Sequence, residues 1–304
     1  MFKASATSLL FIAVVVLLPS QDARAQRLSY SSGQNISPGY EGWEVDADGS
    51  RWFVFGYMKR NWDEEPDIPV GPANAITPGA ADRGQPTHFL PRRNRFVFRV
   101  PIPEDFGQDD EMVWTLTVNG VTERAYASLR PDYIMDPLLR ASEHGAIGAG
   151  TTNPTIRGNQ GPTLTVEGAS TRTVRVGDSL ALTAVATDDG VPESPRKRIL
   201  TFLPDFFNPW VPHTRVTVNT ETGLHVSWLL YRGAGEVLFD PPQIKVWEDT
   251  RTGANSPWGP HFVMPEPPED DRWVTEVTFN EPGAYVLRCR ASDGAADITQ
   301  NVTV

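Results

Sequence analysis

The chain has 304 residues, with 38 acidic and 27 basic side chains and a net charge of −11. Its length is enough for about two domains with a sizeable core. The acidic balance argues against nucleic acid or an anionic membrane as the main partner. The one cysteine, Cys289, excludes an internal disulfide, so stability must come from packing, and we expect this thiol to be buried.

Residues 1–25 have the pattern of a secretory signal peptide. Lys3 precedes the apolar run Leu9–Leu18, and the small-residue motif Ala23-Arg24-Ala25 follows. This order predicts cleavage before Gln26. The apolar run is shorter than the roughly 18 residues that a membrane anchor needs. We therefore expect an exported protein, periplasmic or extracellular, with no membrane insertion after cleavage.

Residues 26–146 are predicted to form a β-rich domain, because short alternating runs lie between Gly, Pro, Asn and Asp. Phe96, Phe98 and Val100 alternate along one expected strand, and Asn119-Gly120 predicts a tight hairpin. The Pro/Gly-rich passage 64–89 is too long for a plain connection, so it is either an ordered functional loop or loose.

The segment around Asp48-Gly49 invites three interpretations: a metal loop, a catalytic acid pair or a turn. An EF-type calcium loop needs further oxygen ligands and a distal Glu, which the segment lacks. Asp-Gly strongly predicts a two-residue hairpin with positive φ at both positions. Such a turn would place Asp46 opposite Arg51 and Val45 opposite Trp52.

One short helix is expected before a linker. Asp136 can cap it, Pro137 suits its first position, and Gly145 can end it. The polar, Gly-rich residues 147–161 then predict an interdomain linker.

Residues 162–304 are predicted to form a β-sandwich. Its expected strands contain Leu164 and Val166, then Leu180–Ala184, Val226–Leu230, Val274–Phe279, Tyr285–Ala291 and Ile298–Val304. The fold class expected for the whole chain is therefore all-β, with two β-sandwich-like domains and one short helix.

Two stretches of this second domain carry a resemblance, "VGDSLALTAVATDDG" and "FNEPGAYVLRCRASDG". They resemble the second and sixth strands of bacterial PKD-type and related immunoglobulin-like domains. The resemblance implies a corner tyrosine at Tyr285 and a core tryptophan at Trp228. The family's usual motif after the third strand is replaced by "SWLLYRGAGEV". The N-terminal half, with "GQPTHFLPRR", resembles only uncharacterised secreted bacterial proteins and implies no function.

No motif for a nucleophilic or zinc enzyme is present, and the five histidines show no metal-ligand spacing. Acids at the predicted strand ends, Asp188, Asp189 and Asp293, are hard oxygen donors of the kind that Ca²⁺ takes. Asp-Asp-Gly and Ser-Asp-Gly are also good turn formers, so a purely structural interpretation stands beside a calcium site.

Two insertions, residues 200–213 and 255–268, are rich in aromatics and proline. Exposed aromatics there, with Trp210, Trp258 and Phe207 as candidates, suit a glycan, a peptide or a protein surface. Alternatively the insertions fold back and cap the sandwich, or they pack against the N-terminal domain. We expect the first insertion to share one end of the sandwich with the acids. The second would join it unless a strand forms between Gly233 and Asp240.

The leading hypothesis is an exported, non-enzymatic binding, adhesion or envelope-structural protein that recognises a glycan or protein through the loops of its C-terminal sandwich. The alternative is an extracytoplasmic carboxylate-dependent hydrolase or its accessory subunit. Two close carboxylates with opposed pKa shifts would favour the enzyme.

Overall fold

The computed structural model of the chain describes residues 30–144, 156, 158–194, 222–243 and 266–304. In these residues the protein is all-β, with four antiparallel sheets and the short helix α2 (Pro137–His144). Two separate hydrophobic cores lie on the two sides of this helix in the sequence. Both findings confirm the predicted fold class of two β-sandwich-like domains.

The N-terminal domain has two three-stranded sheets, β1-β2-β4 and β3-β5-β6. Its strands are β1 (Ile36–Val45), β2 (Arg51–Lys59), β3 (Asn74–Thr77), β4 (Arg92–Pro101), β5 (Met112–Val118) and β6 (Val121–Ala127). A short 3₁₀ helix, η1 (Pro131–Tyr133), follows β6. Aromatic side chains fill the space between the sheets: the ring of Trp114 stands edge-on to that of Phe98, with centroids 4.9 Å apart.

The first hairpin forms, but the predicted turn was wrong. Only Gly49 has a positive φ (86°), and the N–H of Gly49 donates to the carbonyl of Asp46 at 2.9 Å. The loop therefore spans 46–50, and Val45 pairs with Arg51. The carboxylate of Asp48 accepts the N–H of Ser50, a side-chain bond that favours the longer loop. Asp46 pairs instead with Arg99, at 2.5 Å.

The second hairpin agrees with its prediction. Asn119 and Gly120 have φ values of 51° and 77°, and Val118 pairs with Val121 across the turn. A two-residue turn of this kind needs positive φ at both central positions, which Asn and Gly tolerate best. Here the local sequence was sufficient to predict the turn.

Phe96 departs from the predicted alternation of β4. Phe98 and Val100 enter the N-terminal core, whereas Phe96 packs with Val54 and Met135 outside it. The pairing of β2 with β4 shifts at this point, and Phe96 has a φ of 51°. Such a bulge turns one side chain to the opposite face of a strand, which a simple alternating pattern does not reveal.

The passage 64–89 is ordered. It contains β3 and the fully buried polar side chains of Asn74 and Gln85. Of the two alternatives that the sequence left open, the ordered loop is therefore correct. Helix α2 also begins as predicted, because the Asp136 carboxylate accepts the N–H of Leu139 at 2.7 Å.

The C-terminal domain pairs a four-stranded sheet, β10-β11-β8-β7, with a three-stranded sheet, β13-β12-β9. The strands are β7 (Thr163–Val166), β8 (Ser179–Thr187), β9 (His225–Arg232), β10 (Val237–Asp240), β11 (Arg272–Phe279), β12 (Val286–Ser292) and β13 (Asp297–Thr303). This is the strand order of a seven-stranded immunoglobulin-type sandwich. Strand β10 was not predicted.

The predicted inward residues of this sandwich share one core. Trp228, Tyr285, Leu287 and Cys289 are all buried there, with at most 2% of each residue exposed. The hydroxyl of Tyr285 donates to the carbonyl of Glu281 at 2.8 Å. This is the upstream backbone bond of a tyrosine corner.

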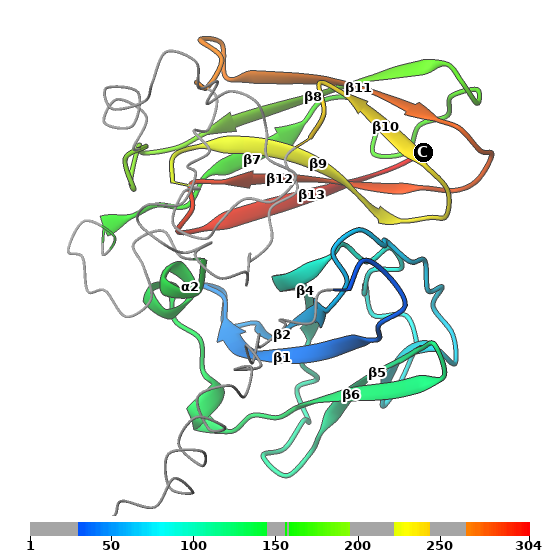
Figure 1. Cartoon of the computed structure of the whole chain (residues 1–304). Helices are drawn as coiled ribbons and strands as arrows, with labels where there is room; N and C mark the ends of the chain where they lie inside the picture. Colours follow the sequence, from blue (N-terminus) through cyan, green and yellow to red (C-terminus); the bar gives the residue numbers. More distant parts are fainter. Residues whose placement is uncertain (1–29, 145–155, 157, 195–221, 244–265) are drawn as a thin grey trace, which may run out of the picture.

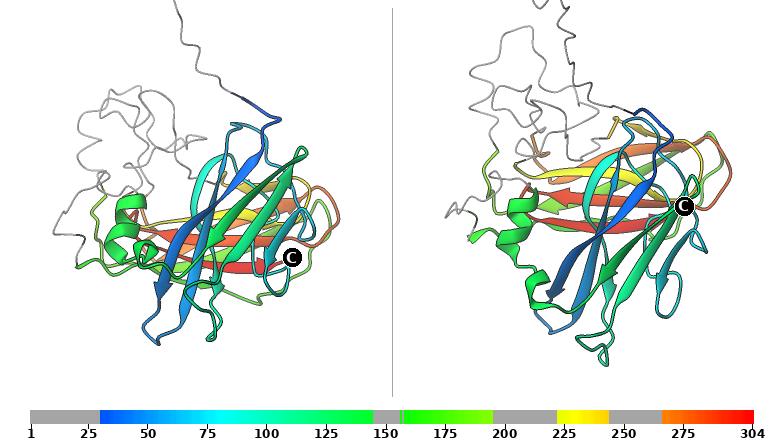
Figure 2. Two further views of the ribbon diagram at one scale, coloured as in Figure 1. Left: turned by 90° about the horizontal axis from the view of Figure 1, so that it is seen from below. Right: turned by 60° about the horizontal axis from the view of Figure 1, so that its bottom comes forward.

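The four sheets are stacked, with β8 and β11 at the top and β5 and β6 at the bottom (Figure 1). Sheets β13-β12-β9 and β1-β2-β4 face one another in the middle, where Arg288 of β12 donates to the carbonyl of Val97 in β4. Figure 2 shows that the strands of the two domains cross steeply. The N-terminal domain therefore lies against the outer face of sheet β13-β12-β9.

Candidate functional site

The three predicted metal ligands lie at one end of the C-terminal sandwich. Asp188 and Asp189 follow β8, and Asp293 follows β12. The pKa of Asp188 is raised to about 6, first by burial and then by the negative charges of Asp293 and Asp189. The structure therefore brings Asp188 close to the other two acids, as the sequence predicted.

Two of these acids already have several hydrogen-bond donors. Asp293 is fully buried, and its carboxylate accepts the N–H groups of Ala295 and Ala296, both at 2.6 Å, as well as the Asn159 amide at 3.0 Å. Asp189 accepts the N–H groups of Gln160 and Val191 at 2.9 Å each. Both acids therefore organise their loops.

Asp188 and Asn159 differ from them. Oδ2 of Asp188 accepts the N–H of Gly190, but its Oδ1 is buried with no hydrogen-bond partner. Oδ1 of Asn159 is likewise buried and without a partner. A buried oxygen acceptor without a donor is costly, and carboxylate and amide oxygens are ligands of Ca²⁺. Asn159, which the sequence analysis did not single out, thus joins Asp188 as a candidate ligand.

The acids alone do not form a metal cluster. Within the described ranges, no group of three or more His, Cys, Asp or Glu side chains is arranged to hold a metal ion. The calcium site remains a prediction, with oxygens from Asp188 and Asn159 as the pair available to it.

The first insertion is attached at the acid-bearing end. Ser194 and Gly223 lie side by side, since a Cβ on Gly223 would fall 2.7 Å from the Cβ of Ser194. The N–H of Gly223 donates to the carbonyl of Asp293 at 2.8 Å. Ser194 and Gly223, the described residues on either side of the first insertion, therefore lie near the acids, as expected.

The second insertion returns to the same end. The backbone N–H of Asp271 donates to the carbonyl of Pro268. The backbone carbonyl of Asp271 accepts the N–H of Ala186, which lies just before the end of β8. We expected an added strand between Gly233 and Asp240 to send this insertion to the far end, and that expectation was wrong. Strand β9 has already carried the chain to the far end, so β10 brings it back.

The predicted ligand-binding residues Trp210, Phe207 and Trp258 lie outside the described residues. Only the points where their segments join the sandwich are described. These points and the acids Asp188 and Asp293 share one end of the domain.

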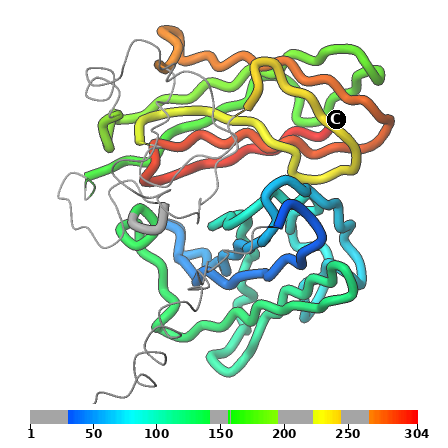
Figure 3. Tube along the Cα trace, viewed as in Figure 1, coloured from blue at the N-terminus to red at the C-terminus, as the bar shows by residue number. Residues whose placement is uncertain are grey.

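A second site, not foreseen from the sequence, joins the two domains. Residues 82–88, here called the docking loop, lie against the end of β9 (Figure 3). Asp82 accepts two hydrogen bonds from Arg232, at 2.8 and 3.0 Å, and the carbonyl of Gly84 accepts the hydroxyl of Tyr231. The N–H groups of Thr87 and His88 both donate to the carbonyl of Tyr231, at 3.1 and 3.2 Å.

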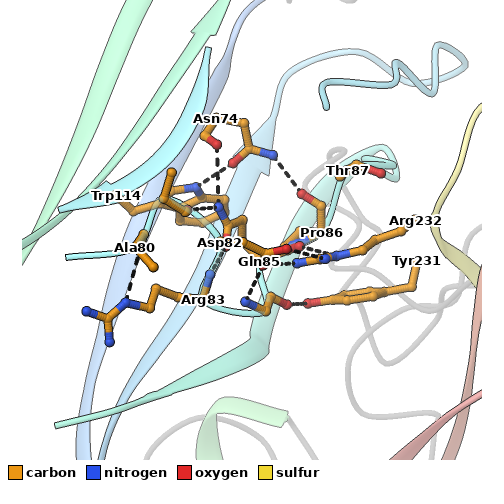
Figure 4. A network of polar contacts seen from close by, with 12 residues as sticks. Asn74, Ala80, Asp82, Arg83, Gln85, Pro86, Thr87, Trp114, Tyr231 and Arg232 are labelled. Atoms are coloured by element: carbon orange, nitrogen blue, oxygen red, sulfur yellow. Dashed lines mark hydrogen bonds and ion pairs between the residues drawn. The ribbon is translucent and has the colours of Figure 1, made fainter. Parts of the chain in front are cut away.

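The buried side-chain amides of Asn74 and Gln85 hydrogen-bond to the backbone of the docking loop and of the residues next to it (Figure 4). Asn74 donates to the carbonyls of Pro86 and Ile68 at 2.8 and 2.9 Å, and it accepts the indole N–H of Trp114 at 3.0 Å. The amide of Gln85 donates to the carbonyl of Ala81 at 2.7 Å. Because these side chains are satisfied and fully buried, they fix the loop in one conformation.

Helix α2 makes a second bridge between the domains. The guanidinium of Arg140 contacts Glu44 of β1 at 3.1 Å and Asp297 of β13 at 3.2 Å. Asp297 also pairs with Arg290 at 3.1 Å. The contact between the domains is thus polar and ionic.

The sequence carried only a weak signal for this contact. The unusual length of the passage 64–89 left an ordered functional loop as one of two alternatives, and nothing in the passage identified Tyr231 or Arg232 as its partners. These residues lie 147 to 150 positions away from their partners in the loop, so their contacts with it are tertiary.

The comparisons with known proteins do not assign a family. No family model matches the chain, and no curated protein matches it. None of the helices in the described part of the chain is long and apolar enough to cross a membrane.

Proposed function

We propose that this chain is an exported, non-enzymatic binding protein, and that its ligand is a glycan or a protein outside the cytoplasm. The ligand contacts the acid-bearing end of the C-terminal sandwich, which carries both aromatic insertions. The observation that carries the proposal is that the described residues flanking both insertions, and Asp188, lie at this one end.

Two further observations support a binding role. The N-terminal domain lies against the outer face of sheet β13-β12-β9 and supports the sandwich on that side. The domains also contact through two polar bridges, at Asp82–Arg232 and at Arg140. A binding loop set on such a pre-organised support loses less entropy when its ligand arrives.

We further propose that calcium acts at this end. The oxygens of Asp188 and Asn159 that have no donor would contribute to its ligand shell, with loop carbonyls and water completing the six to eight ligands that Ca²⁺ takes. Calcium would hold the end of β8 against residues 158–160, and so order the loops that carry the insertions.

The hydrolase hypothesis has less support. The raised pKa of Asp188 suits a general acid, but a second carboxylate must face it across the reacting bond. Asp293 is fully buried, and its two oxygens accept hydrogen bonds from the N–H groups of Ala295 and Ala296 and from the Asn159 amide. It is therefore not available to a substrate.

The test is a glycan and peptide array probed with the purified mature protein, with calcium and with EDTA. We expect binding that is lost in the double variant Trp210→Ala/Trp258→Ala and retained in Tyr126→Ala. Tyr126 is a suitable control because it is 53% exposed on the outer strand β6 of the N-terminal domain. Equal binding by the double variant, or cleavage of an arrayed ligand, would overturn the proposal.

The calcium proposal is tested separately, by the effect of calcium on the melting temperature. Calcium should raise the melting temperature of the wild-type protein by binding only the folded state, and should leave Asp188→Asn unchanged. An equal shift in both proteins would rule out Asp188 as a ligand while leaving the binding role intact.

A further inference from the structure

His88 lies at the point where the docking loop is attached to its own domain. Its ring Nδ1 is 2.8 Å from Oδ1 of Asp67, and its Nε2 is 3.1 Å from Oε2 of Glu65. The side chain is only 9% exposed. The imidazole therefore links the docking loop to the segment 65–67.

This geometry assigns a charge to the ring. An ionised carboxylate can only accept hydrogen bonds, and a neutral imidazole has one donor. With a carboxylate at each ring nitrogen, both nitrogens must donate, which only the imidazolium can do. The pKa of His88 is accordingly raised above its ordinary value of 6.5: burial opposes this, but the hydrogen bonds to Asp67 and Glu65 outweigh it.

The backbone of the same residue contacts the other domain. The N–H groups of His88 and of its neighbour Thr87 both donate to the carbonyl of Tyr231, while the hydroxyl of Thr87 accepts the N–H of Gly233 at 3.2 Å. The 65–67 segment also pairs directly with the loop, since the N–H of Ile68 donates to the carbonyl of Thr87 at 2.7 Å. A shift of His88 would therefore displace the interdomain hydrogen bonds.

We propose that protonation of His88 controls the docking of the two domains: the imidazolium holds residues 82–88 on the end of β9, and loss of its proton weakens that contact. In the neutral ring, one nitrogen bears a lone pair that faces a carboxylate. The resulting repulsion pushes the ring away from Glu65 or Asp67, and the docking loop moves with it.

The sign of the effect follows from the direction of the shift. A histidine whose pKa is raised in the folded state stabilises that state fully below 6.5, and the stabilisation is lost as the pH rises through the higher, folded-state pKa. Docking should therefore weaken as the pH rises above 6.5.

Other groups near His88 do not produce the same response. Lys59, beside Glu65, has a pKa lowered to about 8, mainly by burial. Its deprotonation favours the folded state as the pH rises, so it has the opposite sign. The pKa values of Tyr57, Tyr231 and Tyr285 are raised by burial, and these side chains stay neutral in this range.

Two further charged groups face the site from the C-terminal domain. Arg288 lies under the ring of Tyr231, with its Cζ 3.4 Å from the ring centroid, and it stays charged. Glu281 lies beside Tyr285, whose pKa is also raised by the charge of Asp67. Glu281 does not touch His88, which makes it a useful control.

The experiment is hydrogen exchange of the full mature chain between pH 6 and pH 9, corrected for the intrinsic pH dependence of exchange. The reporters are the amides of Thr87, His88 and Gly233, which make the interdomain bonds. Their corrected exchange should accelerate as His88 loses its proton, about tenfold for each unit by which its pKa is raised. The amides of Gly49 and Gly177, which bond within their own domains, should not follow.

Two variants separate this role from a merely structural one. In Glu65→Gln the new amide donates to the neutral ring, so docking should become independent of pH and stay tight at pH 9. The control Glu281→Gln removes an equal charge beside Tyr285 in the C-terminal domain and should retain the wild-type profile. An NMR titration of the imidazole should give a pKa above 6.5 in the wild type and a lower one in Glu65→Gln.

His88→Gln, which keeps one donor and one acceptor, should exchange rapidly at the three reporter amides at every pH. The proposal is overturned if the wild-type reporters exchange equally at pH 6 and pH 9. It is equally overturned if Glu65→Gln keeps the wild-type pH dependence.

Discussion

The guanidinium of Arg232 and the carboxylate of Asp82 form two parallel hydrogen bonds, at 3.0 and 2.8 Å, between residues that lie 150 positions apart in the chain. The Arg232 side chain is 23% exposed and that of Asp82 is 55% exposed. Asp82 belongs to the N-terminal domain and Arg232 to the C-terminal domain, so this ion pair joins the two sandwiches directly.

The variant Arg232→Lys should lose the parallel geometry, because an ammonium group cannot reproduce the planar fork. Since Asp82 is more than half exposed, we expect a loss of only about 1 kcal/mol in the free energy of unfolding. The hydrogen exchange of the docking loop should accelerate at the same time. Arg272→Lys is the matched control, because Arg272 makes a similar two-point pair with Glu167 inside one domain. If that control loosens the docking loop equally, the Asp82–Arg232 pair does not govern docking.

Trp228→Ala should cost about 3–5 kcal/mol in the free energy of unfolding, the usual range for removing a large buried aromatic. Trp228 is 2% exposed and packs with Leu287 and Cys289. Trp52→Ala offers a contrast, because Trp52 is half-buried with Arg99 4.4 Å above its ring, and should cost about 1 kcal/mol. Denaturant unfolding measures both. A cost below about 1 kcal/mol for Trp228→Ala would contradict its place in the core.

Cys289 should not react with thiol reagents in the folded protein. It is fully buried, and burial raises the pKa of its thiol, so neither access nor the thiolate is available. Labelling followed by mass measurement should show no adduct in buffer and complete modification in denaturant. Rapid labelling under native conditions would show that the C-terminal core opens readily.

Asp188 should make stability depend on pH in the mildly acidic range. Its pKa is raised from 3.8 to about 6, so the protonated form is favoured in the folded state, and stability falls as the pH rises through this window. Asp188→Asn cannot ionise, so without calcium it should melt at a higher temperature than the wild type at pH 7, with no advantage at pH 4. A variant less stable than the wild type at pH 7 would indicate that the negative charge has a partner there.

The mature protein should begin at Gln26. The small-residue motif Ala23-Arg24-Ala25 sets the expected cleavage point, four residues before the first described residue, Tyr30. N-terminal sequencing of protein recovered from a secreting host is the measurement. Recovery of a chain that starts at Met1 would contradict export by this route.

The sequence by itself determined the parts of this protein that depend on neighbouring residues. Asn119-Gly120 closes its turn because both residues tolerate positive φ, and Asp136 caps helix α2 because its carboxylate reaches the N–H of Leu139. The alternation of Tyr285, Leu287 and Cys289 placed these residues in one core, since a strand has a period of two.

Only the tertiary structure decided the rest. The bulge that turns Phe96 away from the core depends on how β4 pairs with β2, and the return of the chain along β10 depends on which end β9 reaches. Gln160 and Asp189 are 29 positions apart, and Asp82 and Arg232 are 150 apart. Contacts over such distances arise only when whole sheets pack, and a local pattern of polarity or turn residues carries no information about which distant partner will face a given side chain.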